Sequence, residues 1–187
     1  MANGYLGSLQ LLKFFLNLMQ IFFQTIIIMS KKPLVFIVED DNFYNSVIST
    51  YLKTKGFEVH SFLSGEECID KLSLHPDIIL LDFMLPGIDG IEVMRRMKAN
   101  NSKSEVIFLS GQTDIKVALE AFHEGAYDYI MKDHHAKENA LNKMDQIMRY
   151  KKICKEKDLY KKSIIVILII LVLSWIALLV FYETQKH

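Results

Sequence analysis

The feature that most constrains this chain of 187 residues is an apolar run that ends in a carboxylate and a turn, IILLDFMLPGIDG at residues 78–90. Four consecutive apolar residues are typical of a strand buried on both faces, as in a parallel sheet. Asp82 follows this strand at its carboxyl end, where ligands bind in open α/β sheets. The Pro-Gly and Asp-Gly steps after it predict a turn before the next helix. Asp82 is therefore either an ordinary strand end or a reactive group.

Strands and helices alternate along the middle of the chain. The apolar periodicity predicts strands at residues 34–38, 57–62, 77–81, 106–109 and 127–131. It predicts helices at residues 42–55, 65–74, 88–97, 114–123 and from 136 onward. Ser64 and Thr113 are the predicted N-caps of two helices, and Gly56 and Gly125 end two others. Five alternations predict an α/β fold with a five-stranded parallel sheet, right-handed crossovers and helices on both faces.

The charge of the chain is uneven, although its 22 basic and 22 acidic residues balance. Residues 31–150 hold 14 basic and 19 acidic residues, a net charge of −5, whereas residues 151–162 hold six Lys and two acidic residues, a net charge of +4. An acidic globule lacks the positive face that nucleic-acid binding requires, so no nucleic-acid partner is predicted. Cys68 and Cys154 have neither metal-ligand spacing nor a disulfide framework, which favours a reduced, cytosolic compartment.

Polar residues follow four of the predicted strands, and the carboxyl ends of parallel strands share one edge of a sheet. They are Asp40 and Asp41 after the first strand, Asp82 after the third, Ser110 after the fourth and Lys132 after the fifth. Each alone is more often a cap, a strand end or a surface charge, but their coincidence favours a site. Three crowded carboxylates repel one another unless a cation joins them, and hard oxygen ligands suit Mg²⁺. Lys132 and the Ser110 hydroxyl would then face the oxygens of a phosphoryl group on Asp82.

With these residues the chain resembles the receiver domain of two-component response regulators over residues 33–150. The resemblance implies the flavodoxin-like doubly wound (βα)5 receiver fold. It also implies site roles: Asp82 as phosphoacceptor, Asp40, Asp41 and Asp82 as Mg²⁺ ligands, Ser110 and Lys132 as phosphoryl contacts, and Ser110 and Tyr129 as switch residues. The implied partners are a histidine kinase or phosphotransfer protein and an unidentified downstream protein. The only implied catalysis is self-catalysed phosphotransfer and autodephosphorylation, so the chain is not expected to be an enzyme.

One residue departs from the family pattern. The family usually has a proline after the lysine, joined by a cis peptide bond, whereas Asp133 follows Lys132 here. A cis bond to a non-proline residue costs about 3–4 kcal/mol, so a trans link or local strain is expected. The extra negative charge near the phosphate predicts a weaker or shorter-lived phosphorylated state.

Two alternative functions stay open at this point. A phosphorylation-independent membrane adaptor would use the receiver fold only to recruit a protein. A hydrolase of the acid-phosphatase type is disfavoured, because those enzymes carry the nucleophile after the first strand in a DxD pattern. Here the first strand is followed by Glu39-Asp40-Asp41.

The C-terminal part of the chain predicts a membrane anchor. Residues 163–182 are 20 residues without a charge, and a helix of that length spans about 30 Å, the thickness of the hydrocarbon core. The lysines of residues 151–162 precede it, so the positive-inside rule predicts a transmembrane helix with the receiver in the cytoplasm and residues 183–187 on the other side. The predicted location is the bacterial inner membrane. The basic neck, residues 151–162, contacts membrane lipid or forms a solvated helix, and no output domain is expected.

The N-terminal residues 1–30 leave two interpretations open. Polar residues recur at spacings of 3 and 4 through this apolar segment, which predicts a membrane-associated helix with one polar stripe. Alternatively, Met29 is the natural start and the preceding residues come from a misassigned start codon. A cleavable signal peptide is disfavoured, because no basic region precedes the apolar run.

Overall fold

The computed structural model describes residue 13, residues 32–111 and residues 115–184. The predicted helix within residues 1–30, apart from residue 13, and the predicted N-cap Thr113 lie outside the described residues. Five strands form a sheet in the order β2-β1-β3-β4-β5, which confirms the predicted five-stranded α/β fold. The chain divides into two compact units, residues 1–106 and residues 107–187.

Two fully buried strands form the centre of the first unit, β1 (Leu34–Val38) and β3 (Ile78–Leu81). They pair in parallel, with Val38 opposite Leu81. β2 (Glu58–Phe62) pairs in parallel with the other side of β1 and mixes buried with exposed residues. An uninterrupted apolar run is what a central strand needs when both faces of its sheet are covered. The apolar run at residues 78–81 therefore correctly predicted a buried strand inside the sheet.

Helix α2 (Asn42–Thr54) covers β1 and β2. Its buried side chains Ile48 and Leu52 lie one turn apart on the face toward the strands. Gly56 follows the helix with a φ of 93°, a left-handed conformation that favours glycine, as predicted for the end of this helix.

Helix α3 (Gly65–Asp70) is shorter than the sequence predicted. Its N-cap is Ser64, as predicted, and the Ser64 hydroxyl accepts a hydrogen bond from Glu67 N at 3.3 Å. The prediction of a helix to residue 74 was wrong, because α3 gives way to the 3₁₀ turn η1 (Leu72–Leu74). His75 then has a φ of 54°. Pro76 disfavours a helical His75, so the chain tightens and turns before β3.

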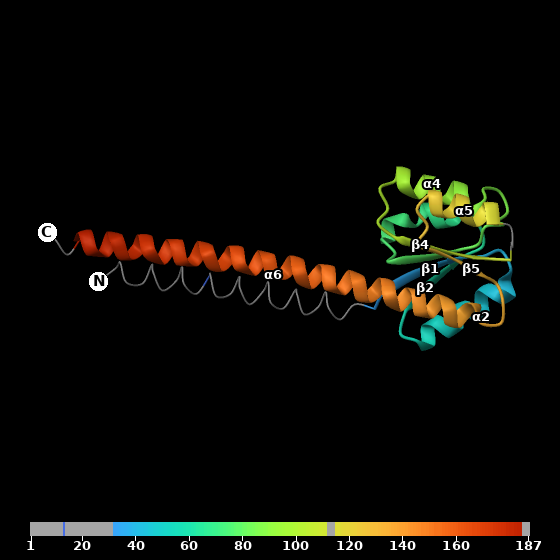
Figure 1. The fold of residues 1–187 in the computed structure, drawn as a ribbon, viewed down its shortest axis with the longest axis horizontal. Helices are drawn as coiled ribbons and strands as arrows, with labels where there is room; N and C mark the ends of the chain where they lie inside the picture. The colour runs from blue at the N-terminus through green and yellow to red at the C-terminus, as the bar shows by residue number, and fades with distance from the viewer. Residues whose placement is uncertain (1–12, 14–31, 112–114, 185–187) are drawn as a thin grey trace. The chain divides into compact units, whose positions relative to one another are not determined.

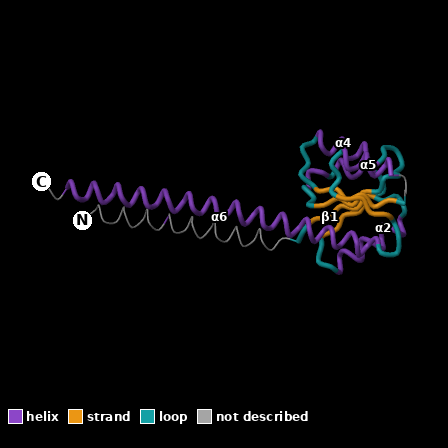
Figure 2. The backbone as a smooth tube through the Cα atoms, viewed as in Figure 1, coloured by secondary structure: helices purple, strands orange, loops and turns teal. Residues whose placement is uncertain are grey.

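Helix α4 (Gly90–Ala99) contacts α3 and lies across the strands from α2 (Figures 1 and 2). The N-cap of α4 is Asp89, so the helix begins two residues later than predicted. Val93, Met94 and Met97 form its buried face. At Gly65 an added Cβ would collide with Val93 and come within 2.8 Å of Ile88, so only glycine allows this approach of α3 and α4.

The second unit is built on β4 (Glu105–Ser110), which begins at the boundary, and β5 (Asp128–Met131). These strands pair in parallel, with Ser110 opposite Met131. Helix α5 (Ile115–His123) and the start of α6 both contact β5. The two helices lie on opposite sides of the strands (Figure 2). Gly125, with a φ of 87°, ends the α5 turn as predicted.

Helix α6 (Ala136–Thr184) is 49 residues long (Figure 1). Its fully buried positions are Ala136, Ala140, Met144 and Ile147, and later described residues are half-buried or exposed. Among the described helices, α6 alone is long and apolar enough to cross a membrane by length and composition, and none of its most apolar window is buried. The transmembrane span at residues 163–182 and the neck at residues 151–162 stay predictions. So does the tail at residues 183–187, of which residues 185–187 lie outside the described residues.

Candidate functional site

Three carboxylates gather at the carboxyl ends of β1 and β3. One oxygen from each of Glu39, Asp40 and Asp82 lies within 4.8 Å of the others. The register explains this cluster, because Val38 lies opposite Leu81 and the next residue of each strand is acidic. Asp82 N donates to Val38 O at 2.9 Å, which holds the two strand ends together. We call Glu39, Asp40 and Asp82 the acidic cluster.

The acidic cluster combines buried and exposed groups. Glu39 and Asp82 are 3% and 5% exposed, whereas Asp40 is exposed. Carboxylates this close and this buried repel one another in the absence of a cation. Their hard oxygen donors match the preference of Mg²⁺, which commonly takes one or two carboxylates and leaves positions for water and phosphate oxygens. The donor set therefore fits the magnesium site typical of receiver domains.

Asp41 has a different environment from the acidic cluster. Its Oδ1 accepts hydrogen bonds from Phe43 N at 2.8 Å and Tyr44 N at 3.1 Å, which makes Asp41 the N-cap of α2. The sequence predicted Asp40, Asp41 and Asp82 as metal ligands and did not indicate Glu39, which belongs to the acidic cluster. The sequence feature that could have indicated Glu39 is its position directly after β1, which places it opposite Asp82 at the end of β3.

Asn45 on α2 holds the end of β1 in place. Its buried side-chain Nδ2 donates to Glu39 O at 3.0 Å and to Phe62 O at 3.2 Å. Glu39 N also donates to Phe62 O, at 3.1 Å. Asn45 therefore ties α2 to the ends of β1 and β2 and positions the backbone that carries the acidic cluster. The sequence pattern of alternating strands and helices did not predict this role of Asn45.

The loop after Asp82 is held by its own hydrogen bonds. Met84 N donates to Asp82 Oδ1 at 3.2 Å, and Gly90 N donates to Phe83 O at 3.0 Å. Gly87 has a φ of 83°, which the turn requires. Met84 is 57% exposed, two residues beyond Asp82.

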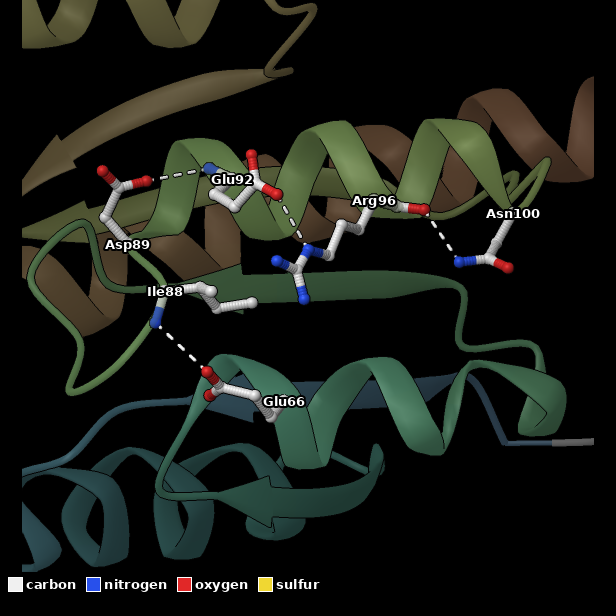
Figure 3. A network of polar contacts seen from close by, with 6 residues as sticks. All are labelled: Glu66, Ile88, Asp89, Glu92, Arg96 and Asn100. Carbon is white, nitrogen blue, oxygen red and sulfur yellow. Dashed lines mark hydrogen bonds and ion pairs between the residues drawn. The ribbon is translucent and has the colours of Figure 1, made fainter.

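Figure 3 shows how this loop is joined to α3 and α4. Glu66 Oε1 on α3 accepts from Ile88 N at 3.2 Å, and Asp89 Oδ1 accepts from Glu92 N at 2.8 Å (Figure 3). Glu92 in turn forms a 2.8 Å ion pair with Arg96. These contacts fix the start of α4 and the α4 end of the loop that follows Asp82.

Ser110, Tyr129 and Lys132 belong to the second unit. Ser110 is fully buried as the last residue of β4, and Lys132 follows β5 directly. Lys132 N donates to Ser110 O at 2.9 Å, so these two predicted phosphoryl contacts are backbone neighbours. The Tyr129 ring stacks on Phe108 with centroids 6.1 Å apart. Their predicted roles toward a phosphoryl group on Asp82 stay predictions.

Asp133 forms a turn between β5 and α6. The described residues contain no cis peptide bond, so its link to Lys132 is trans, one of the two expected outcomes. Asp133 Oδ1 accepts from His135 N at 2.8 Å, and Asp133 O accepts from Ala136 N at 3.2 Å. The exposed Asp133 carboxylate thus helps to start α6.

Two ionisable groups outside the site have shifted pKa values. Burial raises the pKa of the Cys68 thiol to about 12, which keeps it protonated and unreactive. The hydrogen bond to Asp128, together with the charge of that residue, raises the pKa of Lys143 above its ordinary value of 10.5. Lys143 Nζ lies 2.7 Å from Asp128 Oδ2, which ties α6 to β5.

The model of the response regulator receiver domain matches residues 35–145, more than half of the chain. The chain belongs to the response regulator receiver domain family. Solved structures agree with this receiver domain assignment. The BeF3-activated DrrB receiver domain superposes with a TM-score of 0.59 and 27% identity, over 64% of this chain and 99% of DrrB. The Francisella response regulator 1452 receiver domain shares the fold with a TM-score of 0.58, at 24% identity, over 64% of this chain and 99% of that one.

Curated relatives carry the receiver domain within longer proteins. The C4-dicarboxylate transport transcriptional regulatory protein DctD of Rhizobium meliloti is 35% identical over 105 residues, 56% of this chain and 23% of DctD. The cell cycle transcriptional regulator CtrA of Caulobacter vibrioides is 33% identical over 119 residues, 63% of this chain and 51% of CtrA. The chain thus spans about a fifth to a half of the length of the curated relatives it matches.

Proposed function

We propose that this receiver accepts a phosphoryl group on Asp82 from a histidine kinase or phosphotransfer protein, while α6 tethers it to the membrane. The observation that carries the proposal is the acidic cluster, in which buried Asp82 meets Glu39 and Asp40 within 4.8 Å at the strand ends. A buried carboxylate with two carboxylate neighbours is an unfavourable arrangement unless a cation is bound there.

In the proposed reaction, the Asp82 carboxylate attacks the phosphorus of a phosphohistidine. A new O–P bond forms on Asp82 while the P–N bond breaks, and the released imidazole takes a proton from solvent. Glu39, Asp40 and Asp82 would hold the Mg²⁺ ion, which would supply positive charge to neutralise the phosphoryl oxygens. The ammonium of Lys132 and the hydroxyl of Ser110 contact the remaining oxygens. The protein catalyses only its own phosphorylation and dephosphorylation, so it is not an enzyme acting on a separate substrate.

Incubation with acetyl phosphate and Mg²⁺ tests this function. About one phosphoryl group per chain is expected on the wild type, none on Asp82→Asn, and none when EDTA removes the metal. Asp70→Asn is the matched control, because Asp70 is an exposed carboxylate at the end of α3 and should leave labelling unchanged. An unlabelled wild type would contradict the proposal and support a phosphorylation-independent membrane adaptor. Turnover of phosphoesters would instead support a hydrolase.

Asp133 is expected to shorten the phosphorylated state through its negative charge. Asp133→Asn removes this charge and keeps an acceptor for His135 N, so the capping contact survives. We predict that the variant holds its phosphoryl group about two- to tenfold longer, the effect of one screened charge. The decay of labelled protein measures this, and an unchanged half-life would contradict the predicted role of Asp133.

The downstream partner is proposed to bind α5. Ile115, Leu119 and Phe122 are 74%, 63% and 46% exposed and recur at helical spacing on this helix. Phosphorylation shifts Ser110 and Tyr129 between two states and changes the affinity of this face for its partner. Leu119→Asp should abolish phosphorylation-dependent capture of a membrane partner without affecting labelling of Asp82. Capture that is unaffected by Leu119→Asp would place the partner elsewhere.

The tether is proposed to cross the bacterial inner membrane with the receiver in the cytoplasm. It is supported by the length and composition of α6 and by the exposure of its most apolar window. Arginine at both Ile169 and Leu173 should release the chain from membranes at alkaline pH, since each charge at the membrane centre costs about 2.5–3.5 kcal/mol. Ile169→Leu is the control and should stay in the membrane fraction. A wild type extracted by alkaline carbonate would contradict the tether.

A further inference from the structure

Helix α6 separates from its own core after Ile147. The buried positions Ala140, Met144 and Ile147 follow one face of the helix. The same face continues with Lys151 and Cys154, which are only half-buried. Packing against the receiver core therefore does not explain the apolar residues of α6 that lie between Ile147 and the uncharged segment at residues 163–182.

A second series, apolar except at Lys157, begins on a different face of α6. Its positions are Tyr150, Ile153, Lys157, Tyr160 and Ile164, separated by 3, 4, 3 and 4 residues. Ile153, Tyr160 and Ile164 are 61%, 69% and 39% exposed. An alternating 3-4 spacing averages 3.5 residues, which is the repeat of a left-handed coiled coil. We call these five positions the neck seam.

We propose that the neck seam joins two copies of this chain in a parallel two-stranded coiled coil. In heptad terms, Tyr150, Lys157 and Ile164 occupy a positions, and Ile153 and Tyr160 occupy d positions. The occupant of the seam is a second copy because the charges that flank the seam, Glu156 and Lys161, are complementary when two copies pair in parallel.

The charges beside the seam specify the parallel orientation. Glu156 occupies a g position and Lys161 the following e position. In a parallel pair, Glu156 of each copy faces Lys161 of the other, which gives two interchain ion pairs. An antiparallel pair brings g positions against g and e against e. Within one copy, Glu156 contacts Lys152 only at 3.9 Å with both groups largely exposed, so that pair is weak and does not compete strongly.

Lys157 favours two strands over three or four. At an a position of a dimer, its hydrocarbon stem packs in the seam and its ammonium reaches solvent at the edge. In a larger bundle the same ammonium would be buried. A single polar residue at an a position sets register and oligomer state in this way, at a cost in stability.

Site-directed disulfide formation in the full-length membrane-bound protein tests the seam. In a Cys154→Ser background, Ile153→Cys places one thiol against its equivalent across the seam, whereas Lys155→Cys lies on the outer face. The remaining Cys68 is buried, and its thiol pKa of about 12 keeps it unreactive. We expect Ile153→Cys to form dimers at least about tenfold faster than Lys155→Cys, because only the seam positions meet disulfide geometry. Equal rates, or no dimers from either variant, would overturn the proposal.

A charge swap tests the pairing without changing the seam. Glu156→Lys should weaken dimerisation roughly two- to fivefold, the effect of losing two exposed ion pairs. Adding Lys161→Glu should restore wild-type dimerisation. Sedimentation of the full chain in detergent gives the oligomeric state. A monomer, a trimer, or a swap that does not restore the dimer would overturn the parallel dimer.

Discussion

The first unit and helix α6 place their apolar residues in opposite environments. β1 and β3 bury every residue, and their flanking helices begin at side-chain caps such as Asp41 and Ser64. Beyond Ile147, α6 exposes most of its described apolar side chains. The difference teaches that apolar sequence alone does not locate a core. In β3 the apolar run is buried and stabilises the fold, whereas in α6 beyond Ile147 the described apolar side chains stay largely exposed.

The same substitution in each region should give the largest contrast. Ile79→Ala in β3 removes a side chain with no exposed area and should lower the free energy of unfolding by about 2–5 kcal/mol. Ile167→Ala in α6, where the side chain is 56% exposed, should change receiver unfolding by less than about 0.5 kcal/mol. Urea unfolding followed by circular dichroism measures both. Comparable losses would show that α6 contributes to the receiver core.

Asn45 tests whether the ends of β1 and β2 depend on side-chain hydrogen bonds. Asn45→Ala removes two bonds and leaves a buried carbonyl of Glu39 without that donor, which should cost about 1–3 kcal/mol. It should also slow labelling of Asp82, because Asn45 positions the backbone of the acidic cluster. Asn142→Ala on the exposed face of α6 is the matched control and should have little effect on either quantity. Stability lost with labelling unchanged would restrict Asn45 to a structural role.

Gly65 tests the close approach of α3 and α4. Gly65→Ala introduces a methyl group against Val93 and Ile88 and should destabilise the fold by about 1–3 kcal/mol through overpacking. Gly111→Ala is the control, since nothing lies within 4 Å of an added Cβ there. Thermal unfolding compares the two variants, and a neutral Gly65→Ala would mean that the helices move apart easily.

The smallest expected effect is at the Lys143–Asp128 ion pair, which joins the first part of α6 to β5. Lys143→Met should lower the free energy of unfolding by at most about 1 kcal/mol, because the lysine side chain is 40% exposed to solvent. The folded-state pKa of Lys143 is raised, so its stabilisation is complete below its ordinary value of 10.5 and is lost as pH rises through the raised value. Wild type and variant should therefore converge in stability above that range. A difference that persists there would point to packing of the lysine stem.

The sequence predicted the fold well because its signals were local. The buried run of β3, the cap at Ser64 and the left-handed Gly56 each depend on a few neighbouring residues, and all were observed. The predicted helix ends were less accurate where a side-chain cap determines the first residue of the helix. Asp89 caps α4, so that helix begins at Gly90 rather than at Ile88.

The acidic cluster was predicted only in part because it depends on pairing between strands. The Asp40-Asp41 dipeptide resembled a ligand pair in sequence, but the register of β1 and β3 brings Glu39 level with Asp82. The carboxylate of Asp41 is instead used by the first turn of α2. Asn45 could not be identified for a similar reason, since its partners Glu39 and Phe62 lie at the ends of two different strands.

Helix α6 contains neither glycine nor proline from Ala136 to Thr184. Sharp kinks in helices arise mainly at such residues. In a helix without them, the rotation about the helix axis between the face packed on the core and any later face depends on the number of residues between the two faces. Each residue advances that angle by about 100°. One residue inserted after Ile147 would turn every later face by about 100° relative to the receiver, whereas seven would turn it by only about 20°. The number of residues in the neck therefore determines how the later faces of α6 are rotated relative to the receiver. Insertions of one to seven residues would change this rotation in known steps.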